Sequence, residues 1–298
     1  MSVPMHGICA LCNNETNLKE SHLIPKFVGK WLKRTSATGY LRNIENINKR
    51  QQDIFKEYLL CHNCEILFSK WEKLFSEQIF FPSLDKKQYI SSYSEWFSKF
   101  CASLSWRTLI YLKRQNNDFN DESEYFLKQT HQAETHLRNF LLGNTSNLDQ
   151  YEQHIFHLSE IEKPPESLNL PPNINRYFLR SIGIDVLTGN KDIYTFTKLP
   201  TFLIIGIISS KYSKQMRASR VALKQGILRP SNLVMPEYLL GYMKDKARQI
   251  QVKVSGISED QSNKVYETVI SNLDKTADSQ SFEAMMHDYN IFGDKVFK

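Results

Sequence analysis

The sequence has few cysteines and no long apolar run. Its 298 residues include five cysteines, too few for a disulfide framework in a chain of this size. The longest apolar stretch, residues 202–208, is much shorter than a membrane span. Residues 1–7 lack the apolar core that a secretory signal needs. We therefore expect a cytoplasmic protein without a membrane segment.

Internal repeats and low-complexity segments are also missing, and the composition, 41% hydrophobic and 23% charged residues, is that of a folded chain. We predict an α+β fold in three parts. The first part, which contains four of the five cysteines, spans residues 1–80, a mainly helical region spans 81–162, and a C-terminal region with a small sheet and helices spans 173–298. The proline-rich segment KPPESLNLPP at residues 163–172 marks the boundary before the last part.

Apolar periodicity predicts the individual elements. Apolar residues recur at helical spacing after Cys64, so a helix should begin close to Cys61 and Cys64. Thr188, Gly189 and Asn190 predict a turn. The further helices are expected at residues 95–114, 121–142, 236–254 and 258–273, and strands at 176–186, 192–198 and 201–208.

The cysteines form two close pairs and one single residue. Cys9 and Cys12 make one CxxC pair, Cys61 and Cys64 make another, and Cys101 stands alone. Two CxxC pairs supply the four thiolates that closed structural zinc sites use. Because such a site leaves no open position for water, we predict a structural zinc ion and place any catalysis elsewhere.

Positive charge is concentrated between the two cysteine pairs. The chain has a formal net charge of +6, and residues 24–56 carry eight basic and two acidic residues, 8 − 2 = +6. Such a segment beside a zinc site is typical of phosphate binding, although a solvated loop is the alternative. The candidate nucleic-acid-binding residues are Lys26, Lys30, Lys33, Arg34, Arg42, Lys49, Arg50 and Lys56.

Residues 7–72 carry a recognisable order of motifs. The knuckle CALC is followed by ESHLIP at residues 20–25, a basic loop, and LLCHNC, which opens a helix. This order resembles the zinc-knuckle branch of the HNH endonucleases, which has a treble-clef, ββα-metal fold. The resemblance implies that His22 is the general base of a nuclease and that a single divalent metal ion lies opposite it, on the helix.

The chain departs from the family pattern at three positions. Ser21 stands where the family has an acidic or histidine metal ligand, and Glu65 stands where it has His or Asn. Lys56 and Glu57 occupy the place of the central Asn. Glu65 could still bind Mg²⁺ or Mn²⁺, which prefer oxygen ligands, and Asp53 is expected on the strand beside His22 as a second carboxylate, preferred over Glu72.

Three functions remain open from the sequence. The first is a metal-dependent endonuclease acting on nucleic acid, with DNA as the expected substrate, a role in bacterial defence by analogy and a regulatory protein partner. The second is a catalytically inactive, zinc-stabilised nucleic-acid-binding module, in which His22 only caps the zinc site or bonds within the hairpin. The third is a protein-interaction scaffold. A second basic stretch, residues 211–229, either extends a nucleic-acid track or forms a solvated edge.

Overall fold

The computed structural model describes residues 5–84, 90–115, 123–189, 191–211, 213–229 and 235–297. These residues form a mixture of helices and small antiparallel sheets, which confirms the expectation of a mixed α and β chain. None of the helices in these ranges combines the length and the apolar character needed to cross a membrane.

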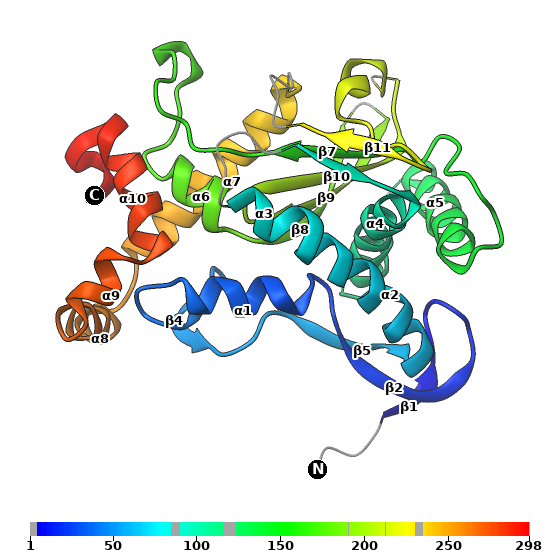
Figure 1. The fold of residues 1–298 in the computed structure, drawn as a ribbon, viewed down its shortest axis with the longest axis horizontal. Helices are drawn as coiled ribbons and strands as arrows, with labels where there is room; N and C mark the ends of the chain where they lie inside the picture. Colours follow the sequence, from blue (N-terminus) through cyan, green and yellow to red (C-terminus); the bar gives the residue numbers. More distant parts are fainter. Residues whose placement is uncertain are drawn as a thin grey trace.

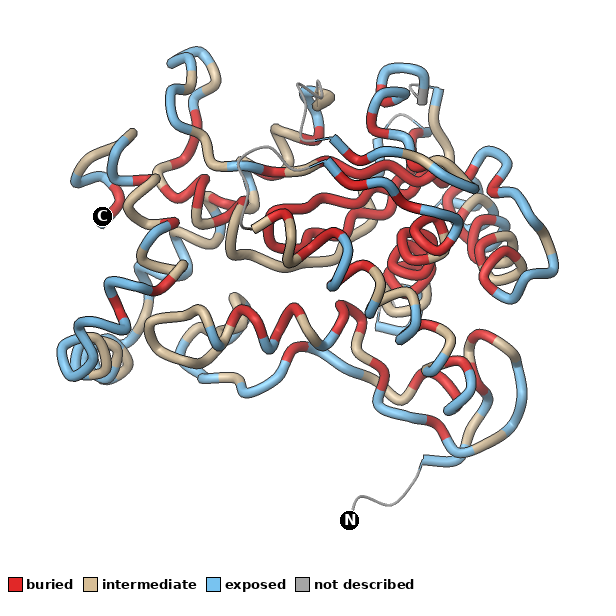
Figure 2. The backbone as a smooth tube through the Cα atoms, viewed as in Figure 1, coloured by how far each residue is buried: buried red, intermediate tan, exposed pale blue. Residues whose placement is uncertain are grey.

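A four-stranded antiparallel sheet lies at the centre of the chain (Figure 1). The two inner strands are buried along nearly their whole length. The strand at residues 202–209 is accordingly almost continuously apolar, whereas the strand at residues 192–199 also buries polar side chains such as Thr195 and Lys198, which are hydrogen-bonded. Figure 2 shows both strands in the buried interior. In spatial order the strands are β7 (Gln153–His157), β10 (Phe202–Ser209), β9 (Asp192–Leu199) and β8 (Gly183–Gly189).

Helix α4 (Glu95–Gln115) packs on one face of this sheet at very short range. A Cβ atom added at Gly206 would lie 2.3 Å from Ser105 Oγ and 2.4 Å from Thr195 Oγ1, so only glycine permits this approach. The hydroxyls of Thr195 and Ser105 are hydrogen-bonded at 2.8 Å. Gly206 and small polar side chains therefore fix α4 against the sheet.

The opposite face is covered by α6 (Ile174–Arg180) and α7 (Glu237–Ser255). Alternate residues of β10 point to the two faces, because Phe202 and Ile204 join the core under α4 whereas Leu203 and Ile205 join the core under α7. Two further helices, α5 (Glu124–Leu142) and α10 (Gln280–Phe292), pack beside α4 and α6 respectively.

The N-terminal part is a separate small sheet followed by a helix. It consists of β1 (Met5–Ile8), β2 (Glu15–His22) and β5 (Lys56–Cys61), in the order β1-β2-β5, and of α2 (His62–Phe75). The segment between β2 and β5 contains α1 (Lys26–Arg34) and a hairpin of β3 (Leu41–Asn43) and β4 (Asn46–Gln51). A short π-helix (Ser76–Phe80) and α3 (Phe81–Leu84) continue α2.

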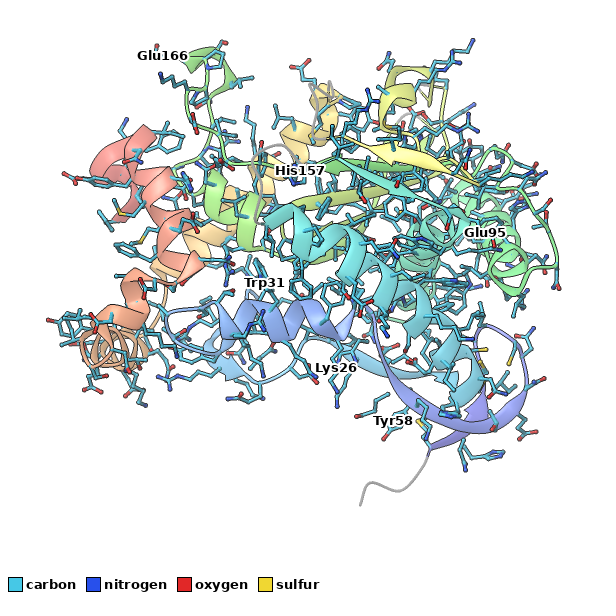
Figure 3. The ribbon with its side chains drawn as sticks, in the orientation of Figure 1. Lys26, Trp31, Tyr58, Glu95, His157 and Glu166 are labelled. Atoms are coloured by element: carbon cyan, nitrogen blue, oxygen red, sulfur yellow. The ribbon has the colours of Figure 1, made fainter. Side chains whose placement is uncertain are left out.

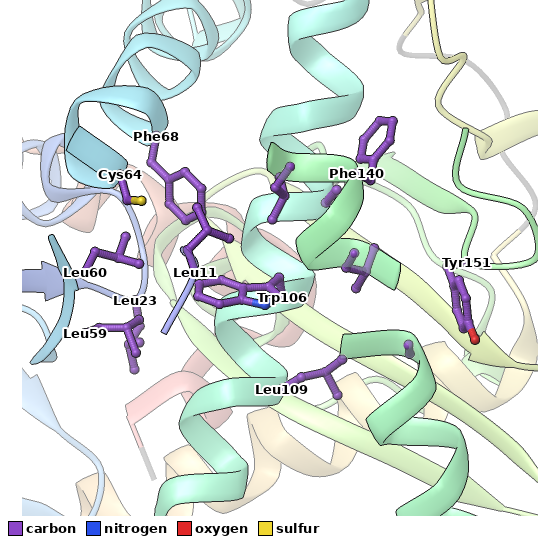
Figure 4. Packing of buried hydrophobic residues seen from close by; sticks show 14 of the residues in the cluster. Leu11, Leu23, Leu59, Leu60, Cys64, Phe68, Trp106, Leu109, Phe140 and Tyr151 are labelled. Carbon is purple, nitrogen blue, oxygen red and sulfur yellow. The ribbon is translucent and has the colours of Figure 1, made fainter. Parts of the chain in front are cut away.

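Two apolar clusters join the N-terminal unit to α4. In the first, the rings of Phe68 on α2 and Trp106 on α4 meet edge to face, with centroids 5.9 Å apart, and in the second, Phe75 stacks on Phe100 at 4.2 Å. Figure 4 shows Cys64 and Phe68 on one side of the first cluster and Trp106 and Phe140 beyond them. The cysteine pairs and the body of the chain are therefore packed together.

The C-terminal helices α8 (Glu259–Ile270) and α9 (Leu273–Ala277) lie beside the β3–β4 hairpin (Figure 1). The Ser258 amide donates to Asn48 Oδ1 at 2.8 Å, and Arg42 Nη2 donates to Gln261 Oε1 at 3.4 Å. The short strands β6 (Ser91–Tyr93) and β11 (Gly226–Leu228) pair with each other.

Several sequence expectations need correction. Residues 176–180 belong to α6 and not to a strand, because Ile174, Tyr177 and Phe178 have helical spacing and all three are buried. Thr188 and Gly189 continue β8, and position 190 lies outside the described residues. Strand β7 was not predicted. The predicted helix at 121–142 begins at Glu124, with positions 121 and 122 outside the described residues, and the one at 258–273 ends at Ile270.

Candidate functional site

The four cysteines of the two CxxC pairs converge at one point. Their sulfur atoms all lie within 4.8 Å of one another, and the Cys12 and Cys61 sulfurs are 3.8 Å apart. A tetrahedral zinc ion with bonds of about 2.3 Å holds its sulfurs about 3.8 Å apart, whereas a disulfide needs about 2.0 Å. The described cysteines are all free thiols, so the geometry fits zinc and not a disulfide.

Local backbone structure presents the first pair of sulfurs. Cys9 and Asn14 close a tight turn through a hydrogen bond of 3.0 Å, and Asn13 adopts a left-handed conformation with φ 61°. The Ala10 amide donates to Leu59 O at 3.0 Å, which fastens this turn to β5. The strand end at Cys61 and the first turn of α2 present the other two cysteines.

Hydrogen bonds favour the thiolate form of Cys9. The Cys64 thiol donates to Cys9 and, with backbone amides, lowers the pKa of Cys9 to about 4, although burial opposes the charge. One of these amides, Cys61 N, lies 3.2 Å from the Cys9 sulfur. A thiolate is the form that binds a metal ion, so the residues present suit a structural zinc site.

His22 is the last residue of β2 and contacts Asp53. The distance from His22 Nε2 to Asp53 Oδ2 is 3.2 Å, and the side chains are 13% and 41% exposed. Burial raises the pKa of Asp53, but the hydrogen bond and charge of His22 outweigh it, and the net shift is downward. The expectation that Asp53 lies on a strand is wrong. It lies in the loop between β4, which ends at Gln51, and β5, which begins at Lys56.

Arg107 reaches the same place from α4. Its Nη1 donates to the main-chain oxygen of His22 at 2.7 Å and to Glu72 Oε1 at 2.8 Å, and its side chain is only 3% exposed. Burial raises the pKa of Glu72. The charge of Arg107 lowers it, but the effect of burial is larger. No local sequence signal points to Arg107, which lies 85 residues from His22.

Ser21 and Glu65 stand at the two positions that correspond to metal ligands of the HNH endonucleases. Ser21 is buried, 1% exposed, and its hydroxyl donates to Lys19 O at 3.4 Å. Glu65 is half-buried on α2, and its charge contributes to the raised pKa of Glu72. In the described ranges, the four cysteines are the one group of three or more His, Cys, Asp or Glu side chains close enough to share an ion. His22, Asp53 and Glu65 therefore form no second group of this kind.

The eight predicted basic residues divide into two sets. Lys33 and Arg42 donate to the main-chain oxygens of Gln52 and Ile47, and Lys56 forms an ion pair with Glu20. Lys56 is nevertheless exposed, and so are the other five, of which Arg50 lies 4.4 Å from the centre of the Tyr40 ring: Lys26, Lys30, Arg34, Lys49 and Arg50.

Three of the exposed basic residues lie on the outer side of α1. Lys26, Lys30 and Arg34 alternate along this helix with Val28 and Trp31, which are buried. Figure 3 shows Trp31 on the side of α1 that faces the body and Lys26 on the opposite side. The helix therefore presents a basic face to solvent.

A polar pocket of about 550 Å³ lies at the cysteine end of the small sheet. It is bordered by the turn at Asn13 and by His62, which is exposed. His22 pairs with Lys56 at the other end of the same strands, whereas Leu18 pairs with Cys61. The pocket and the His22–Asp53 contact therefore lie at opposite ends of the small sheet.

The chain matches no protein-family model, no curated protein and no solved structure.

Proposed function

We propose that this protein is a metal-dependent nuclease that hydrolyses phosphodiester bonds of nucleic acid, with DNA as its first candidate substrate and an HNH-like, treble-clef unit at residues 5–75. The observation that carries the proposal is the contact of 3.2 Å between His22 and Asp53 at the end of β2. It lies in a unit of two paired strands and a helix whose cysteines suit a structural zinc ion. The order of the motifs in residues 7–72 supports the same function.

In this proposal His22 removes a proton from the attacking water. A carboxylate only accepts hydrogen bonds, so Asp53 favours the tautomer with the proton on Nε2. The Nδ1 lone pair of His22 then accepts the proton of the attacking water. Asp53 thus acts as the residue that orients the base, a role that suits its position better than metal ligation does.

The divalent ion of this proposal is Mg²⁺ or Mn²⁺, with the Glu65 carboxylate as its protein ligand. Magnesium sites often use one or two carboxylates and complete their coordination with water and substrate phosphate. An ion held by Glu65 would stabilise charge on the phosphate and on the leaving oxygen. Glu72 is less suited to this task because its carboxylate is bound to Arg107.

The test is cleavage of plasmid and of single-stranded DNA with Mg²⁺ or Mn²⁺. We expect His22→Ala to abolish cleavage while zinc content stays the same. His131→Ala is a matched control, because His131 is an exposed histidine on α5. Equal cleavage by wild type and His22→Ala would reject His22 as the base.

A second candidate function is an inactive zinc-stabilised module that binds nucleic acid. It is favoured by the buried position of Ser21 and by the failure of His22, Asp53 and Glu65 to form a shared ion site in the described chain. It predicts DNA binding without cleavage under every metal condition. Failure to bind nucleic acid at moderate salt would leave the scaffold function.

A further inference from the structure

Arg107 makes a set of contacts that neither the zinc site nor proton transfer requires. Besides His22 O and Glu72, its guanidinium donates to Ser103 O at 3.3 Å and lies 5.3 Å from the centre of the Phe68 ring. The guanidinium thus contacts β2, α2 and its own helix.

A buried ion pair is weak evidence for stability, because removing two charges from water offsets much of their attraction. The geometry of this pair has a more specific consequence. The Arg107 donor that binds Glu72 also binds the carbonyl of His22, and α4 is itself fixed to the central sheet at Gly206. The main chain that carries His22 is therefore tied to the central four-stranded sheet.

We propose that Arg107, held by Glu72, is a positioning residue that fixes the main chain of His22 and thereby aims its imidazole toward Asp53 and the substrate. Arg107 acts through His22 and does not contact the scissile phosphate. The effect on cleavage rests on the proposed nuclease function, whereas the effect on the His22–Asp53 hydrogen bond does not.

The sharpest test replaces both charges together. The double variant Arg107→Met, Glu72→Met keeps side-chain volume and leaves no buried charge unpaired, so it is expected to fold. His22 O then lacks its donor. Arg107→Lys is a second variant, because lysine keeps the charge without the planar fork of arginine.

Arg114→Met is the matched control. Arg114 is exposed on the same helix and donates to Tyr58 O on β5 at 3.3 Å, without touching His22. It measures the effect of losing one arginine contact between α4 and the small sheet. We expect this variant to cleave at the wild-type rate.

We expect the double variant to bind zinc, to keep the wild-type KM and to lose about 100-fold in kcat, the size of effect that a displacement of about 1 Å can cause. Arg107→Lys should retain more activity than the double variant. In NMR spectra, the Nε2–H signal of His22 that reports the bond to Asp53 should broaden or shift in the double variant and stay unchanged in Arg114→Met.

A folded double variant with an unchanged kcat and an unchanged His22 signal would overturn the inference. If the wild type does not cleave any substrate, the proposed nuclease function fails and the NMR signal alone decides the positioning role. If the double variant does not fold, the same two measurements on Arg107→Lys decide it, with an unchanged result again overturning the inference.

Discussion

Asp53 Oδ2 lies 3.2 Å from His22 Nε2, although 31 residues separate the two in the chain. Antiparallel pairing of β2 with β5 places Lys56 opposite His22, and the loop just before β5 then brings Asp53 within reach. A carboxylate beside a half-buried imidazole determines which ring nitrogen carries the proton.

The first prediction concerns this carboxylate. Asp53→Asn should lower kcat for cleavage by about 100-fold or more, because an amide can also donate to Nε2 and so allow the wrong tautomer. Zinc content should not change, since Asp53 contacts His22 at the end of β2 that is remote from the cysteines. Steady-state cleavage at saturating DNA measures the effect, and a wild-type kcat would show that Asp53 does not orient His22.

Zinc loss should be specific to the clustered cysteines. Cys64→Ser is expected to lower zinc from about one ion per chain to about zero and to lower the melting temperature, because zinc binding to such a site contributes to folding. Cys101→Ala is the control, since Cys101 is buried away from the cluster in another core. Metal analysis of both purified variants measures this, and full zinc content in Cys64→Ser would contradict the site.

Gly206→Ala should destabilise the protein by about 1–3 kcal/mol, the usual cost of an overpacked core. The new Cβ would meet Ser105 and Thr195 at less than 3 Å. Gly183→Ala is the matched control because no atom lies within 4 Å of its added Cβ. Urea unfolding compares the two, and equal stability would mean that α4 can shift away from the sheet at low cost.

The pH dependence of stability should contain a contribution from His154. This side chain is fully buried on β7, and its Nδ1 lies 3.0 Å from Met216 O. Burial lowers its pKa from 6.5 to about 4.

Between these two pH values the unfolded chain binds a proton at His154 that the folded chain does not, so stability falls as the pH falls through this range. The shift corresponds to about 3 kcal/mol. Unfolding of His154→Gln at pH 7 and pH 4.5 should show a smaller loss than wild type. The variant His131→Ala, which changes an exposed histidine, should behave like wild type. An equal loss in His154→Gln and wild type would exclude this contribution.

The two basic segments should differ in nucleic-acid binding. Replacing Lys26, Lys30 and Arg34 with glutamine should weaken binding and reduce the slope of log K against log salt by up to about 0.9 for each lost phosphate contact. The matched set Lys214, Arg217 and Lys224, also exposed and basic, should have a smaller effect. Equal losses in both sets would instead extend the binding track across residues 211–229.

The sequence predicts those parts of the site that depend on local pattern. The spacing of each CxxC pair brings its two sulfurs together within one turn. The two pairs also lie close together, so the four cysteines predicted from the sequence form one cluster. Apolar periodicity predicts α2, which begins at His62, and the long helix α4. Many of the apolar residues in α4 are buried.

Long-range contacts could not be predicted in this way. Arg107 sits within an apolar helix, and no local pattern shows that its guanidinium meets a carbonyl of β2. Strand β7 is only five residues long and contains two histidines, which hides its buried character. The misassigned strand at residue 176 shows the same limit, because α6 has only seven residues, about two helical turns, and so short a segment gives no clear apolar period.

The core shared by Phe68 and Trp106 has a consequence for modular exchange. A fragment ending at residue 84 would keep the four clustered cysteines but expose Phe68 and Phe75, which are buried against α4 in the full chain. It would also lose Arg107. The N-terminal unit is therefore not a cassette that recombination could transplant onto an unrelated protein, and any chain that inherits it must inherit a helix equivalent to α4 as well.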